Sequence, residues 1–154
     1  MAFETVISRF NTKISHSKFH VHMPSLFTRI INGEIPAHIV AENDQYMAFL
    51  DINPLAKGHT LVIPKTEVDY YFDLDDTTLA GLTVFSKKVA RAIEKEIPCL
   101  RVGVCVLGLE IPHAHVHLIP LNSMGDINFS KPKLKLSQDE FASIAEKISR
   151  HFGK

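Results

Sequence analysis

Residues 113–120 read HAHVHLIP, a stretch in which three histidines alternate with small or apolar residues. Successive side chains of a β-strand point to opposite faces, so this spacing predicts His113, His115 and His117 on one face of a sheet. Neighbouring histidines on that face would lie about 6.6–6.8 Å apart, and the outer two about 13 Å apart. The residues between them are expected to face the core.

The spacing of the three imidazoles bears on whether they bind a metal or act on a phosphate. Zinc holds nitrogen ligands at about 2.0–2.1 Å, so the three histidines do not readily converge on one ion, although two could with help from elsewhere. A neutral central histidine is a nucleophile near neutral pH, and protonated neighbours can neutralise phosphate oxygens. Like charges repel, so coupled titration should keep at least one ring neutral. The pattern favours phosphoryl chemistry, with solvated surface histidines and half a metal site as alternatives.

The flanking sequence predicts three helices and five strands. Apolar residues at intervals of three and four predict one long helix between Asp75 and Ile97. A capping box at 137–140 begins a C-terminal helix, and Ser25 can cap a short helix over about 26–31. Five short β-type segments lie at 38–42, 46–50, 59–63, 101–107 and 113–119, and the first three are expected to pair antiparallel.

Composition excludes several classes of protein. A chain of 154 residues with 45% hydrophobic residues fits one globular domain. Lys+Arg and Asp+Glu both number 17, so no global field favours nucleic acid or an anionic membrane surface. No stretch reaches the roughly 18 apolar residues of a membrane span. Cys99 and Cys105 lack metal spacing and are expected to be reduced core residues, which favours a cytoplasmic protein.

Residues 1–22 differ in composition, since Glu4 is their only acidic residue. We expect an N-terminal extension before a single domain at 23–154. An upstream start before Met23 and a weak organelle-targeting segment are the alternatives. His20 and His22 are expected to be solvated, not metal ligands.

The run HAHVHLIP resembles the His-x-His-x-His signature of the histidine triad (HIT) family. Residues 27–65, FTRIINGEIPAHIVAENDQYMAFLDINPLAKGHTLVIPK, are similar to the amino-terminal half of that family, so the likeness covers about residues 25–120. The resemblance implies an α+β fold, in which a five-stranded antiparallel sheet packs with one long and one C-terminal helix and is continued across a homodimer. It also implies a nucleotide-binding hydrolase or transferase that needs no cofactor.

The resemblance implies roles for five residues by position. His115 would be the nucleophile that attacks the α-phosphate and forms a covalent nucleotidyl-histidine. His113 and His117 would hold the phosphate and assist the leaving group, and His59 would contribute from the neighbouring strand. Asp51 would accept hydrogen bonds from the ribose hydroxyls, with a turn or cap role as its alternative.

An apolar pocket for the base is implied as well. The matching residues are Leu26, Phe27, Ile30 and Ile52. Ordinary core packing is the alternative for them, and both roles can hold at once.

The chain departs from the family where many relatives bind structural zinc through Cys-x-x-Cys and two histidines. Ser25 and Thr28 occupy the cysteine positions, and Glu67 replaces one histidine. No structural zinc is therefore expected.

The segment before the triad also departs from the family. Val102, Leu109 and Glu110 stand where relatives usually place polar residues that contact the phosphate or the leaving group. If Glu110 points into the site, its carboxylate would repel a polyphosphate tail and favour an amine leaving group; otherwise it faces solvent.

We therefore expect a phosphoramidase-like enzyme acting on a purine nucleotide or nucleoside phosphoramidate. Three other functions compete with this one: cleavage of dinucleoside polyphosphates, nucleotide binding with little turnover, and metal binding.

Overall fold

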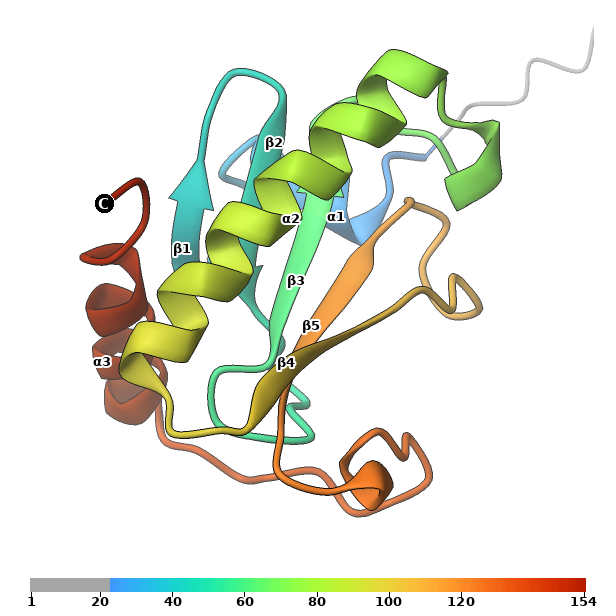
Figure 1. Ribbon diagram of the computed structural model, residues 1–154. Coiled ribbons are helices and arrows are strands. Elements are labelled where there is room, and N and C mark those ends of the chain that lie inside the picture. Colours follow the sequence, from blue (N-terminus) through green and yellow to red (C-terminus); the bar gives the residue numbers. More distant parts are fainter. Residues whose placement is uncertain (1–22) are drawn as a thin grey trace, which may run out of the picture.

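The computed structural model describes residues 23–154, and the predictions for residues 1–22 lie outside the described residues. Five antiparallel strands form one sheet in the order β1-β2-β3-β5-β4 (Figure 1). The strands are β1 (Ile39–Glu42), β2 (Tyr46–Leu50), β3 (Thr60–Pro64), β4 (Arg101–Cys105) and β5 (Val116–Leu121). The helices are α1 (Leu26–Ile31), α2 (Asp76–Glu96) and α3 (Gln138–Ser149), with short 3-10 turns at Tyr71–Asp73 and Met124–Asp126. The predicted α+β fold is confirmed.

Local hydrogen bonds explain where several elements begin. The Asn43 side chain accepts from the backbone N–H groups of Gln45 and Tyr46, which closes the β1–β2 hairpin. Asp75 caps α2 by accepting from Thr78 N. The predicted capping box at the start of α3 is present, and Ser25 caps α1 as predicted.

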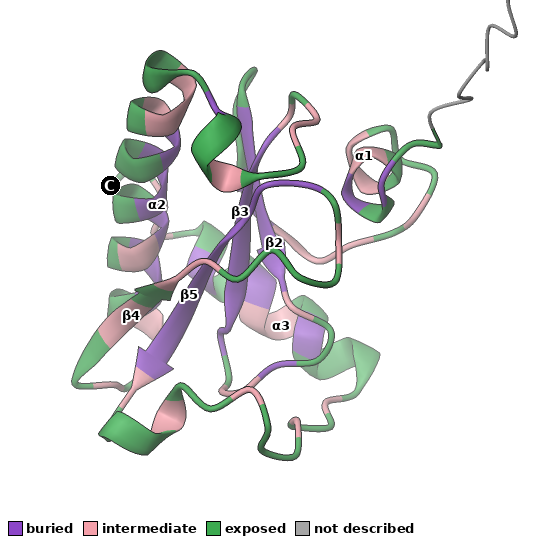
Figure 2. Cartoon of the chain, turned by 90° about the vertical axis from the view of Figure 1, so that its right-hand side faces the viewer, coloured by how far each residue is buried: buried purple, intermediate pink, exposed green. Residues whose placement is uncertain are grey.

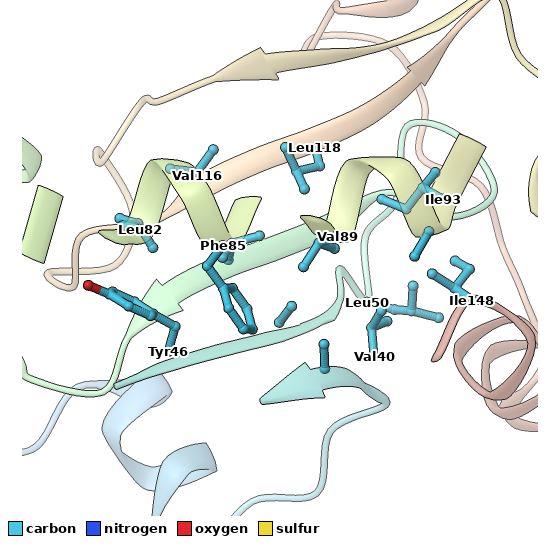
Figure 3. Close-up of a cluster of buried hydrophobic side chains, with 14 of the residues drawn as sticks. Val40, Tyr46, Leu50, Leu82, Phe85, Val89, Ile93, Val116, Leu118 and Ile148 are labelled. Atoms are coloured by element: carbon cyan, nitrogen blue, oxygen red, sulfur yellow. The ribbon is translucent and has the colours of Figure 1, made fainter. Parts of the chain in front are cut away.

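The long helix α2 covers one face of the sheet (Figure 1). Its buried residues Leu82, Phe85, Val89 and Ile93 meet strand residues such as Leu118 in the larger core cluster (Figure 3). Ala114 and Val116 also belong to this cluster, so the residues between the histidines do face the core. No helix in the described part of the chain is long and apolar enough to cross a membrane.

A smaller core cluster lies on the other face of the sheet. It consists of Phe27, Met47, Phe49, Leu61 and Ile63. Figure 2 shows α1 and α2 on opposite sides of the buried strands. Because both faces are covered, β2 and β3 are buried along their whole length and lack the polar alternation of a half-exposed strand.

Two predictions from the sequence are wrong in detail: the start of β5 and the placement of the two cysteines in the core. Strand β5 begins at Val116, so His113 and His115 precede it. The backbone N–H of His113 bonds to the Ile111 carbonyl and that of Ala114 to the Val68 carbonyl, which removes both from the sheet ladder. Cys99 and Cys105 are free but only half-buried, outside the core clusters.

Candidate active site

A cavity of about 420 Å³ opens on the face of the sheet that carries α1. Its wall is largely apolar, with contributions from α1, β2, β3 and the loop before β5. The polar side chains that line it are few: Asp51, Asn53, Glu110, His115, His117 and Lys133. A mostly apolar cleft with a few convergent polar groups is typical of a small-molecule site.

The structure brings the four predicted histidines close to one another but not into an even row. His115 and His117 line the cavity, with ring centroids 5.0 Å apart. His59 lies behind His117 at a centroid distance of 5.3 Å. His113 does not line the cavity; it is fully buried, and its ring packs against Phe27.

The hydrogen bond of His115 fixes its tautomer. Its Nδ1 atom lies 2.7 Å from the backbone oxygen of His113. A carbonyl can only accept, so Nδ1 carries the proton and donates it. The lone pair of His115 is therefore on Nε2, the atom that a nucleophilic imidazole would use.

A relay of hydrogen bonds fixes the tautomers of His59 and His117. Leu55 N donates to His59 Nδ1 at 3.1 Å, so the proton of neutral His59 is on Nε2. That Nε2 lies 3.0 Å from His117 Nδ1, which must accept. The proton of neutral His117 is therefore on Nε2, and the residue can donate a hydrogen bond.

Burial keeps these histidines uncharged at neutral pH. Burial, together with the smaller effects of His115, His59 and Lys133, lowers the pKa of His117 to about 3. Burial lowers the pKa of His59 to about 4, although Asp51 opposes this, and burial also lowers the pKa of His113. The expectation that protonated neighbours neutralise the phosphate is wrong for the resting site, because desolvation and mutual repulsion disfavour their charge.

Asp51 lies between β2 and the His59 loop and lines the cavity. Its Oδ1 accepts from Asn53 N at 2.8 Å, which is the turn role considered for it. Its Oδ2 lies 3.6 Å from His59 Nε2. The carboxylate therefore stabilises the turn while it faces the cavity.

All four residues of the implied base pocket line the cavity. Phe27 is at the same time a core residue, with its ring at right angles to the His115 ring. Leu26 and Ile52 are 42% and 66% exposed, so their apolar surface is available to a ligand.

The three residues that depart from the family before the triad separate in space. Glu110 and Leu109 line the cavity and are exposed to solvent. Val102 lies in β4, packs against the larger core cluster and does not line the cavity.

Two further residues of the cavity wall were not predicted from the sequence. Phe129 contacts the His117 ring at a centroid distance of 5.1 Å and the His59 ring at 6.3 Å. Lys133 donates to the Phe129 carbonyl at 2.6 Å and lies over its ring. A lone aromatic residue in the polar stretch before α3 was the only signal for this contact.

The described residues do not fit the zinc site of the family. Ser25, Thr28, Glu67 and His113 do meet in space, but this set contains no thiolate, and its polar atoms are hydrogen-bonded to one another. Asp51, His59 and His117 are the one group of three metal-ligating side chains found within residues 23–154. Within this group His59 Nε2 donates a hydrogen bond to His117 Nδ1.

Comparison with known proteins agrees with the fold. Residues 32–124 match the HIT domain. The chain is 34% identical over 132 residues to an uncharacterised HIT-like protein of Borreliella burgdorferi, covering 80% of this chain and 95% of that protein. It is 34% identical over 129 residues to the adenosine 5'-monophosphoramidase of Schizosaccharomyces pombe, covering 82% and 97%.

A solved structure gives the same result. The chain superposes on the Hit-like protein involved in cell-cycle regulation from Bartonella henselae with a TM-score of 0.74 and 31% identity, covering 82% of this chain and 95% of that one. The fold and the histidine-lined cavity thus define a protein of the nucleotide hydrolase and transferase superfamily. The chain belongs to the HIT family.

Proposed function

We propose that this protein hydrolyses a nucleoside phosphoramidate through a covalent nucleotidyl intermediate on His115. The observation that carries the proposal is the 2.7 Å bond from His115 Nδ1 to the His113 carbonyl, which leaves the Nε2 lone pair on a residue of the cavity wall. The name of the S. pombe relative supports the choice of substrate.

The reaction has two displacement steps. In the first, His115 Nε2 bonds to the α-phosphorus, the P–N bond breaks, and the departing amine takes a proton from solvent. In the second, water attacks the same phosphorus, its proton passes to solvent, and the electron pair of the N–P bond returns to His115. A preorganised donor such as His117 Nε2–H would stabilise the charge that develops on the phosphate oxygens in both steps.

Lys133 is the residue we assign to the negative charge of the phosphate. The neighbouring histidines are neutral, and Lys133 is the only lysine or arginine among the described residues that line the cavity. Ammonium groups make strong, charge-assisted hydrogen bonds to phosphate oxygens.

The nucleoside would occupy the apolar end of the cavity. A purine ring would pack against Leu26, Phe27, Ile30 and Ile52, and Asp51 would accept from the ribose hydroxyls. His113 and His59 would not touch the phosphate. His113 would orient His115, and His59 would orient His117.

Mass spectrometry of protein quenched during turnover of an adenosine phosphoramidate tests the reaction. We expect a nucleotidyl adduct on His115. Comparing kcat/KM for this substrate with that for diadenosine tetraphosphate separates the phosphoramidase from a polyphosphate hydrolase. Binding of nucleotide without turnover would instead favour the binding-module alternative.

The exposed β4 edge of the sheet favours a second copy of this chain as the binding partner. Strand β4 is the last strand of the sheet, and Val104 on it and Leu100 just before it are exposed. An exposed edge with apolar side chains is a template for pairing with another strand. We propose a homodimer with a continuous sheet, acting in the cytoplasm, and light scattering during gel filtration tests its mass.

A further inference from the structure

We propose that Ser25, Thr28 and Glu67 are positioning residues that hold His113 in place and, through its backbone carbonyl, orient His115 for attack. The inference rests on the proposed function, because it concerns the residue proposed as nucleophile. It adds three residues that touch neither the α-phosphate site nor His115 and that belong to two other segments of the chain.

His113 is fixed through both ring nitrogens. Its Nε2 lies 2.8 Å from the Pro64 carbonyl, so Nε2 carries the proton and donates it. Its Nδ1 must then accept, and the Ser25 hydroxyl lies 2.9 Å from it. Because the ring is fully buried and both nitrogens are bonded, it can neither turn nor shift without losing a hydrogen bond.

Glu67 and Thr28 fix the direction of the Ser25 hydroxyl. A single Glu67 carboxylate oxygen accepts from the Ser25 backbone N–H, at 3.0 Å, and from the Thr28 hydroxyl. The Thr28 proton is therefore used on Glu67, and the Thr28 backbone N–H occupies a lone pair of Ser25 Oγ at 3.1 Å. The Ser25 hydroxyl can then donate to His113 Nδ1 at 2.9 Å, which is nearer than its other acceptor, Thr28 Oγ1, at 3.1 Å.

The position of His113 determines the orientation of the His115 ring, which lies two residues further along the chain. The carbonyl that accepts from His115 Nδ1 belongs to His113 itself, so a displaced His113 ring carries this acceptor with it. The segment lies before β5 and lacks a sheet ladder to hold it. Helix α1 contributes a second restraint, because Phe27 packs against the rings of both histidines. The network supplies the support that ladder bonds give to His117.

Steady-state kinetics of Ser25→Ala test the inference. We expect kcat to fall roughly ten- to a hundredfold, because misorientation of a nucleophile has effects of that size, with KM nearly unchanged. Loss of the α1 cap is a confounding effect, so Ser137→Ala, which removes the cap of α3 away from the cavity, is the matched control. The control is expected to keep the wild-type kcat.

A second pair of variants keeps the inference testable if Ser25→Ala does not fold. Thr28→Val removes the hydroxyl that donates to Glu67, and Thr28→Ser restores it. We expect kcat to fall in the first and to recover in the second. Nitrogen NMR of the imidazoles should show His113 Nδ1 as an acceptor in the wild type and a changed His115 Nδ1 signal in Ser25→Ala and Thr28→Val.

The outcomes separate this inference from the proposed function. Unchanged kcat and unchanged His115 Nδ1 signals in Ser25→Ala and Thr28→Val would overturn the positioning role and leave the nucleophile assignment intact. Full activity of a His115→Asn variant would overturn the proposed function, whatever the imidazole signals of His113 show.

Discussion

His59 Nε2 lies 3.0 Å from His117 Nδ1, and both rings are buried. The backbone N–H of Leu55 sets the direction of this bond, so each of the two histidines carries its proton on Nε2. With pKa values of about 4 and about 3, the pair is neutral at pH 7. It can therefore act as an oriented hydrogen-bond donor but not as a resting cation.

The neutral pair makes stability depend on pH. The pKa values of His59 and His117 in the folded protein lie below the ordinary 6.5, so the unfolded chain binds more protons as the pH falls below that value. The contribution to stability is complete above pH 6.5 and is lost as the pH falls toward about 4 for His59 and about 3 for His117. Each histidine is expected to add up to about 1.4 kcal/mol per pH unit. Urea unfolding at several pH values measures this slope, and His59→Gln should reduce it; an equal slope in that variant would contradict the assignment.

His115→Asn should abolish the covalent intermediate. Loss of a nucleophile that acts together with its neighbours reduces kcat by at least about a thousandfold. Nucleotide binding should persist, because the apolar wall and Asp51 are unchanged. Intact-protein mass spectrometry measures the adduct, and isothermal titration with AMP measures binding. An adduct on the variant would place the nucleophile elsewhere.

Lys133→Gln should weaken phosphate binding more than it slows the chemistry. Removing one charged hydrogen bond is expected to raise KM about tenfold. Lys131→Gln is the matched control, because Lys131 donates to the Gly125 carbonyl in the same segment but does not line the cavity. Initial rates at low and high salt measure the effect. Equal KM values for the two variants would remove Lys133 from the phosphate site.

Glu110→Gln should alter the choice of leaving group. The exposed carboxylate lines the cavity and would repel an anionic tail, with an effect reduced by solvent screening. The preference for an adenosine phosphoramidate over diadenosine tetraphosphate is expected to fall about two- to fivefold in kcat/KM. If the preference is the same in both proteins, Glu110 faces solvent in the complex and another residue selects the substrate.

The elements that short-range patterns specify were the ones that the sequence predicted well. The helical spacing located α2, and the Ser137 capping box located α3. The start of β5 was predicted three residues too early, because it depends on the bond from His113 to the Ile111 carbonyl and on the bond from Ala114 to the distant Val68 carbonyl. Periodicity within the HAHVHLIP run carries no information about those partners.

In the candidate site, too, local sequence patterns did not predict the contacts that depend on the finished fold. The histidines and the α1 residues Leu26, Phe27 and Ile30 were predicted, because the His-x-His-x-His pattern and the family likeness point to them. The strand residues Phe49, Leu50 and Leu61 also line the cavity and were not predicted as site residues. Phe129 and Lys133 were missed, because they lie in an irregular stretch whose position depends on the finished fold. The neutral state of His117 was also missed, since burial, which lowers its pKa most, is not visible in a single strand.

The cluster of Ser25, Thr28, Glu67 and His113 has a consequence for the conditions under which the protein can work. Hydrogen bonds between the protein's own side chains hold the histidine segment where relatives are expected to use an ion. Its geometry is then supplied by folding alone. Activity should persist in the presence of strong chelators and under zinc starvation, so the protein would remain competent when the metal supply of the cell fails.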